Sequence, residues 1–120
     1  MGARIEIKYC GEFATIFLVG TMGGQRPGDD ALIYLFEDGI KTLISGDHVR
    51  VVADLQKVSW MNSTGLGALM GAMTLLRNKG GDLKLAKIPD NVENLFAITK
   101  LNTIFDTFGT VEDAIAAFSK

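Results

Sequence analysis

The sequence is poor in the residues that build metal sites and catalytic centres: its 120 residues include one Cys, one His, two Pro and one Trp. Cys10 alone cannot form an intramolecular disulfide, and small secreted domains often carry several, so we expect a cytoplasmic protein. His48 has no second candidate ligand or catalytic partner, and the carboxylates stand singly along the chain. We therefore expect no metal site, no cofactor and no enzymatic activity.

Long hydrophobic runs and an excess of one charge are also missing. The longest apolar runs, 16–19 and 31–36, are far shorter than the ~20 residues that span a bilayer, and the N-terminus has no signal pattern. The 12 Lys and Arg against 14 Asp and Glu give a net charge of −2 without a basic stripe. We expect neither nucleic acid nor membrane as a partner.

The chain does have enough apolar residues for one core. Hydrophobic residues make up 48% of it, with a mean hydropathy of +0.23. No linker, repeat or low-complexity segment divides it, so we expect residues 1–120 to form a single domain. The methionines Met70 and Met73 share a helical stripe with Leu66 and Leu69, which favours core packing for both.

The hydrophobic pattern predicts strands that alternate with helices. Alternation over 5–9 and the β-branched run 15–19 predict a hairpin, and the apolar run 49–55 predicts a strand covered on both faces. We expect later strands at 82–86 and 103–108, the second of which is at least an extended segment. Helices are expected at 32–44 after a cap at Asp29 or Asp30, at 63–79, at 90–98, and at 111–118 after a cap at Thr110. This order implies an α/β fold with a mostly parallel sheet and an antiparallel first strand on its edge.

Two glycine-rich segments follow predicted strands. Residues 20–28 are too rich in glycine for a regular element and predict a long, mobile loop, and residues 62–67 form a strand-to-helix turn. In an α/β sheet the functional surface lies where strands end and helices begin, so we expect both segments at one rim. Neither matches a full phosphate-binding motif, but a small-ligand or nucleotide-binding domain that uses the glycine-rich loop stays open as an alternative.

Ser63 in this turn has two interpretations. In the first, Asn62 or Ser63 simply caps the helix by accepting a backbone N–H bond. In the second, Ser63 is a phosphorylation switch: the helix N-terminus tolerates a phosphate, whereas a hydrated dianion disrupts any surface that must lose water to bind a partner. The neighbouring Trp60 is expected in the core, with a place at the rim as the alternative.

The residues around this turn resemble the signature of STAS domains, in particular the bacterial anti-sigma factor antagonists. The resemblance covers nearly the whole chain in family order, and its core is the Ser-Thr-Gly-Leu-Gly sequence at 63–67. It extends over the segments 51–55, 58–69, 79–85, 101–105 and 110–115. The resemblance implies a STAS-type mixed, mostly parallel sheet of four to five strands with about four helices.

The resemblance also implies a phosphorylation-controlled binding module for transcription regulation. Unphosphorylated Ser63 would let the protein sequester an anti-sigma factor that is also a serine kinase of the histidine-kinase-like ATPase class, which releases a sigma factor. Phosphorylation of Ser63 would end this binding, and a PP2C-type phosphatase would restore it. The expected partner-binding rim consists of Gly23, Gly24, Asn62, Ser63, Thr64, Gly65 and Leu66.

The sequence departs from the family pattern at two places. Asn62 stands where the family usually has Asp, so it brings no negative charge, and the glycine-rich segment 22–28 replaces a compact polar start of the first helix. Asn62 favours the alternative that the protein is a scaffold STAS domain in a signalling complex, in which Ser63 is only a helix cap. Thr64 could accept phosphate in place of Ser63, but is expected to lie in the first helical turn. We also expect Gly65→Val to impair both folding and partner binding, because a β-branched side chain crowds that turn next to the expected binding rim.

Overall fold

The computed structural model describes residues 2–119, except for the side chain of Asn102. The prediction that residues 1–120 form one domain thus reaches past the described residues at both ends. The sheet has the order β1-β2-β3-β4-β5, with β1 (Arg4–Cys10), β2 (Phe13–Met22), β3 (Arg50–Met61), β4 (Asp82–Ala86) and β5 (Thr107–Phe108). Strand β1 pairs antiparallel with β2, and all other pairs are parallel. The predicted mixed, mostly parallel α/β sheet is confirmed.

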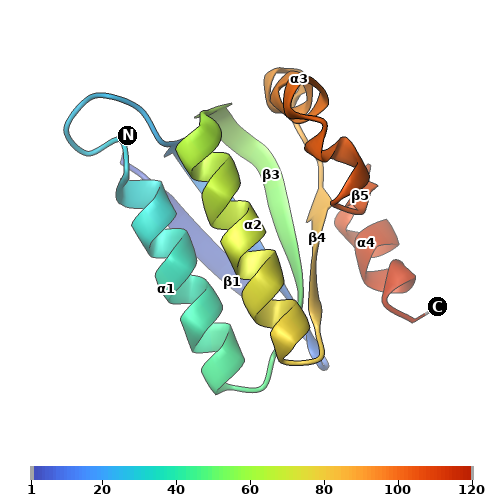
Figure 1. Cartoon of the computed structure of the whole chain (residues 1–120). Coiled ribbons are helices and arrows are strands. Elements are labelled where there is room, and N and C mark those ends of the chain that lie inside the picture. Colours follow the sequence, from blue (N-terminus) through green and yellow to red (C-terminus); the bar gives the residue numbers. More distant parts are fainter. Residues whose placement is uncertain (1, 120) are drawn as a thin grey trace.

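Helices cover the two faces of this sheet unequally. α1 (Ala31–Ser45) and α2 (Ser63–Asn78) lie side by side across one face, as Figure 1 shows. α4 (Val111–Ala117) packs on the other face, where Ala114 joins a small cluster with Val52 and Ala86. α3 (Asp90–Thr99) and the short 3-10 helix at Leu101–Thr103 follow β4. Within residues 2–119, a helix therefore covers the second face on the β3–β5 side alone.

The main core lies between the sheet and the pair α1 and α2. Alternate strand residues such as Ile16, Ala53 and Leu85 point into it and are fully buried. Met73 is buried and Met70 packs against the core, so both methionines have the predicted role. Gly39 lets α1 lie close to the sheet, because a Cβ there would come within 2.9 Å of Ile16 Cδ1.

Strands β2 and β3 are longer than the sequence predicts. β2 includes Gly20, Thr21 and Met22, which the composition predicts in the loop, because parallel pairing with β3 continues to the pair Met22 and Met61. Irregularities in the register and a φ of +126° at Gly20 let the strand absorb its glycine. Pairing with a neighbouring strand thus overrides the local composition.

The predicted strand at 103–108 is mostly wrong. Only Thr107–Phe108 pairs with β4, and the residues before it form a 3-10 turn and an irregular segment. Phe105 is buried and lies 5.7 Å from Phe96, ring centre to ring centre. The apolar residues of this segment therefore cover the core beside α3 instead of extending the sheet.

Candidate functional site

The two glycine-rich segments meet at the edge of the sheet where α1, α2 and α3 begin (Figure 1). Strands β2 and β3 end next to each other there, and the Asn62 N–H donates to the Met22 carbonyl at 3.2 Å. Gly23 follows directly and lies against the Asn62 side chain. The sequence prediction that both segments share one rim is confirmed.

Asn62 is the N-cap of α2. Its backbone is extended, with a φ of −112°, and its side-chain Oδ1 accepts a hydrogen bond from the Gly65 N–H at 3.1 Å. Its carbonyl accepts the first intrahelical bond, from Leu66, at 3.0 Å. The prediction that Asn62 or Ser63 caps α2 is therefore confirmed for Asn62, whereas Ser63 is the first residue inside the helix.

Ser63 and Thr64 are both exposed in the first turn of α2. Amide groups at this position have no intrahelical acceptor, and they carry the positive end of the helix dipole. The first turn of α2 has no acidic residue, whereas that of α3 contains Asp90 and Glu93. The first turn of α2 itself thus brings no carboxylate that would repel an added anion.

Glycine is required at two positions of this rim. Gly23 has a φ of +101°, and a Cβ there would overlap the Asn62 side chain. Gly65 has helical geometry, but a Cβ there would overlap the Met22 carbonyl oxygen. The rim therefore holds together through close contact between the end of β2 and the first turn of α2. A side chain added at Gly65 would therefore be crowded by Met22 of β2 as well as by the first turn of α2.

The loop before α1 is tied by Asp29. The Asp29 carboxylate accepts a bond from the Arg26 N–H at 2.8 Å, and its carbonyl accepts one from Gly23 at 3.3 Å. Gly24, with a φ of +153°, lies against the same carboxylate. The long loop predicted over 20–28 is thus shorter than expected and closed by hydrogen bonds. Asp30 occupies the N-cap position of α1, but its side chain makes no cap bond, and Asp29 supports the loop instead of the helix.

The predicted rim residues differ in what they present to solvent. Ser63 and Thr64 are exposed, and Asn62 and Gly24 are partly so. Leu66 is only 3% exposed and packs in the core, and Gly23 and Gly65 are also buried, so these three residues present little surface to a partner. Gly23 and Gly65 instead pack against Asn62 and Met22 beneath the exposed residues of the rim.

Trp60 is a rim residue that the sequence did not place correctly. Its side chain is 45% exposed, so the expectation of core burial is wrong. The register shift between Gly20 and Thr21 breaks the alternate burial of β3, and no period-two pattern could therefore have located Trp60. Next to it, the Ser59 carbonyl accepts a bond from the Asn91 side chain at 2.9 Å, which ties α3 to this end of β3.

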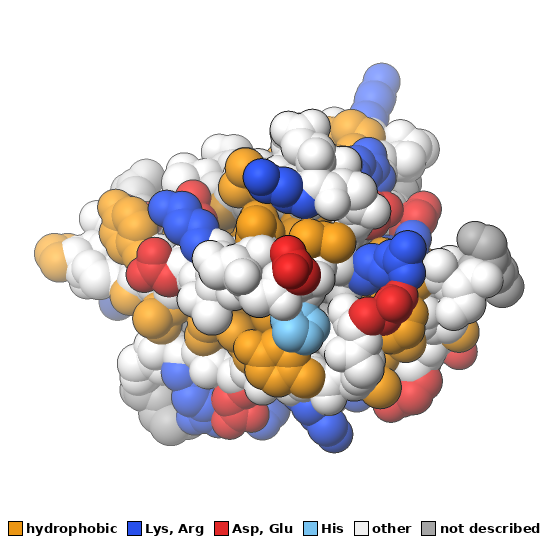
Figure 2. Space-filling view, turned by 90° about the horizontal axis from the view of Figure 1, so that it is seen from below, with side chains coloured by type: hydrophobic (Ala, Val, Ile, Leu, Met, Phe, Trp, Pro, Cys, Tyr) orange, Lys and Arg blue, Asp and Glu red, His pale blue; other side chains and the backbone are white. Residues whose placement is uncertain are grey.

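The other candidate residues lie apart from the rim. Cys10 is exposed in the edge strand β1. The His48 ring lies edge-on to Tyr9, 4.7 Å away between ring centres, and Figure 2 shows the histidine beside hydrophobic surface at the end of the molecule away from the start of α2. Among residues 2–119, no three His, Cys, Asp or Glu side chains are close enough to hold a metal ion. No helix within the same residues could cross a bilayer.

Sequence comparisons point to one group of proteins. The STAS domain family model matches residues 29–114. An anti-sigma-B factor antagonist of Bacillus subtilis is 38% identical over 61 residues, which are 51% of this chain and 56% of that protein. An anti-sigma-B factor antagonist of Listeria monocytogenes is 43% identical over 53 residues, or 44% of this chain and 46% of that protein. The matched regions thus span about half the length of these curated relatives.

Solved structures of similar proteins share the fold. An anti-sigma factor antagonist from Mycobacterium paratuberculosis superposes with a TM-score of 0.80 at 17% identity, covering 99% of this chain and 96% of that one. SpoIIAA in its unphosphorylated form gives 0.78 at 19% identity, covering 97% and 96%. SpoIIAA in its phosphorylated form gives 0.71 at 20% identity, covering 96% and 99%. At these identities the likeness concerns the fold alone.

Proposed function

Because the chain belongs to the STAS domain family, we propose that it is an anti-sigma factor antagonist whose binding is controlled at Ser63. The unphosphorylated protein sequesters an anti-sigma factor and so releases a sigma factor. Phosphorylation of Ser63 ends this binding. The observation that carries the proposal is the position of Ser63: exposed, first in α2, in a turn without acidic residues and close in sequence to the exposed Trp60.

The proposed switch acts on affinity and not on the fold. A phosphate on Ser63 faces the amide groups and the positive dipole end of α2, which stabilises it by ~0.3–1 kcal/mol. The same group adds a charge of about −1.5 to −2 to a surface that must lose water when a partner binds. Phosphorylated and unphosphorylated SpoIIAA both superpose on this chain, in keeping with a modification that leaves such a fold intact.

The chemistry of phosphate transfer belongs to the partners in this proposal. The proposed anti-sigma factor is also a serine kinase of the histidine-kinase-like ATPase class, and a PP2C-type phosphatase removes the phosphate. The chain itself acts as a binding module without catalysis. Its proposed contact surface, the Ser63 surface, consists of Trp60, Asn62, Ser63, Thr64 and Gly24, the rim residues with solvent-accessible atoms.

A scaffold role is the second candidate, and Asn62 favours it. The Asn62 side chain is neutral and is already used to cap Gly65, so it offers a kinase no carboxylate next to Ser63. A scaffold STAS domain would bind its signalling partners regardless of phosphate. The two functions therefore differ in one measurable property, the response of partner binding to negative charge at Ser63.

The test is affinity capture from native lysate with wild type, Ser63→Ala and Ser63→Asp as baits. Captured proteins are identified by mass spectrometry, and wild type from the same cells is examined for phosphate on Ser63. The switch predicts that Ser63→Ala captures an ATPase-fold kinase that Ser63→Asp loses. Equal capture by both baits would instead support the scaffold, and the absence of any such kinase from the Ser63→Ala bait would overturn the antagonist.

Ser119→Asp is the matched control. Ser119 is exposed near the end of α4, away from the Ser63 surface. The Ser119→Asp variant therefore adds the same charge as Ser63→Asp without changing the rim. It should capture the same proteins as wild type. Loss of capture with this variant as well would show that net charge, and not charge at Ser63, governs binding.

A further inference from the structure

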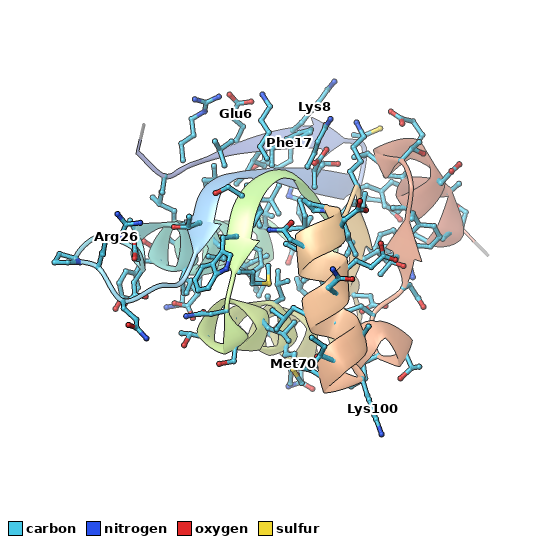
Figure 3. All side chains as sticks on the ribbon, turned by 90° about the horizontal axis from the view of Figure 1, so that it is seen from above. Glu6, Lys8, Phe17, Arg26, Met70 and Lys100 are labelled. Atoms are coloured by element: carbon cyan, nitrogen blue, oxygen red, sulfur yellow. The ribbon has the colours of Figure 1, made fainter. Side chains whose placement is uncertain are left out.

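The sheet face opposite α1 and α2 is open on the side of β1 and β2. On this open face, Glu6, Lys8 and Phe17 point away from α1 and α2, as Figure 3 shows. Two hollows of about 290 and 250 Å³ lie here and share Phe17, Asp54 and Lys87 as lining residues. They form one groove, which we call the open-face groove, between the edge strand and the start of α4.

Asp54 lies at the centre of this groove and is only 5% exposed. Its Oδ1 accepts a hydrogen bond from the Gln56 N–H at 2.9 Å. Among the described residues its Oδ2 has no hydrogen-bond donor, and their ion pairs involve Glu12, Asp82 and Asp106 but not Asp54. None of the buried side-chain oxygens among the described residues lacks a hydrogen-bond partner, so Oδ2 is open to solvent and a ligand can reach it from the groove. The groove thus contains a carboxylate oxygen without a cationic partner.

The two ends of the open-face groove differ in chemistry. Arg4, Lys57 and Lys87 line the larger hollow, and none of them is within ion-pair distance of Asp54. Val111 and Ile115 of α4 line the smaller hollow. Glu6 also lines the larger hollow, and Lys8 and Glu112 also line the smaller one. A ligand that extends through both hollows therefore meets an excess of cations at one end, Asp54 in the middle, and apolar side chains with one charge of each sign at the other end.

We propose that the open-face groove binds a small zwitterion with an apolar tail, of the class of apolar α-amino acids. The ligand ammonium group pairs with Asp54, its carboxylate with Arg4 and Lys57, and its side chain lies between Phe17 and Ile115. Charge-assisted hydrogen bonds of this kind contribute about 1.5–3 kcal/mol each, so both charged groups of the ligand are needed for affinity. The volumes suit a small metabolite rather than a larger ligand.

The test uses L-leucine and L-phenylalanine as probes of the purified chain. Backbone amide shifts in ¹H–¹⁵N spectra are followed during titration to about 10 mM, a range that detects millimolar affinity. At least one probe should shift the amides of Asp54, Gln56 and Lys87 and reach saturation. 3-Methylbutylamine and 4-methylpentanoate each lack one charged group of leucine. Each should bind at least about tenfold more weakly than leucine does.

Variants separate binding from a general effect on the fold. Asp54→Asn keeps the oxygen that accepts from Gln56 but removes the charge, and Arg4→Gln changes an exposed side chain on the edge strand; each should weaken probe binding about tenfold. Asp38 is an exposed residue of α1, outside the groove, so Asp38→Asn should bind the probes as wild type does. No saturable shift with either probe, or unchanged binding in both Asp54→Asn and Arg4→Gln, would overturn the proposal. Neither result bears on Ser63.

Discussion

The backbone of Gly23 lies directly against the side chain of Asn62, so closely that a Cβ on Gly23 would overlap the Asn62 amide. Asn62 in turn caps α2 through Gly65, and the Gly65 backbone lies against the Met22 carbonyl. One chain of contacts thus links the end of β2, the end of β3 and the start of α2. It fixes the position of Ser63 relative to the rest of the rim.

Gly23→Ala should destabilise the protein more than Gly28→Ala. Both glycines have a positive φ, +101° and +89°, but only the Gly23 side chain would meet Asn62, whereas Gly28 faces open space. The difference should be at least about 1 kcal/mol in the free energy of unfolding, the value of a disrupted helix cap. Urea denaturation measures it. Equal losses would show that Asn62 moves aside without weakening its cap.

Gly65→Ala and Gly67→Ala should have opposite effects, although the positions are two residues apart in α2. A Cβ at Gly65 overlaps the Met22 carbonyl, so Gly65→Ala should cost about 1–3 kcal/mol. A Cβ at Gly67 meets nothing within 4 Å, so Gly67→Ala should stabilise the protein by about 0.5–1 kcal/mol through helix propensity. Thermal unfolding distinguishes the signs. A stabilising Gly65→Ala would contradict the close packing at the rim.

Asn62→Ala should lose about 0.5–2 kcal/mol of stability, because the Gly65 N–H then loses its side-chain acceptor. Asn62→Asp keeps an acceptor and adds a negative charge at the helix N-terminus, so it should be as stable as wild type or more stable by ~0.3–1 kcal/mol. Chemical denaturation at low ionic strength measures both. A loss of stability in Asn62→Asp equal to that in Asn62→Ala would show that the amide group itself is needed.

Lys84→Met should affect stability less than Lys84→Ala. The Lys84 side chain is 9% exposed, and its Nζ pairs with Asp106 at 2.8 Å and lies 4.9 Å from the centre of the Phe118 ring. Asp106 is 60% exposed, so water solvates it when the lysine is removed. Met keeps the buried stem and should cost about 1 kcal/mol or less, whereas Ala also loses the packing. Similar losses in both variants would indicate that the charge dominates.

The sequence predicts the order and type of most elements because their hydrophobic periods are regular. The helix caps at Thr110 and Asn62 follow from residue type, and Thr110 Oγ1 does accept a bond from the Asp113 N–H at 3.0 Å. Strand ends are different. Residues 20–22 pair with Val58, Trp60 and Met61 because the two strands lie side by side in the fold, a tertiary effect that local composition does not contain.

The rim was predicted as a location but not as a surface. Sequence position brings the ends of β2 and β3 together, and topology alone is enough for that inference. The irregular register of β2 and β3 places Trp60 at the surface, against the expectation of core burial. Leu66 of α2 is buried because its side of the helix packs on the core, so its part in partner contact stays a prediction. The requirement for glycine at Gly23 appears only when the Asn62 side chain is placed.

The central claim is that negative charge at Ser63 controls partner affinity. Its most direct test is calorimetric titration of the captured kinase, without ATP, with this chain in unphosphorylated form and in a form fully phosphorylated on Ser63. The account predicts that phosphorylation weakens binding about 100-fold or more, or ~2.7 kcal/mol, while the unfolding temperature of the chain changes little. Equal affinity of the two forms would contradict it and leave the chain a scaffold.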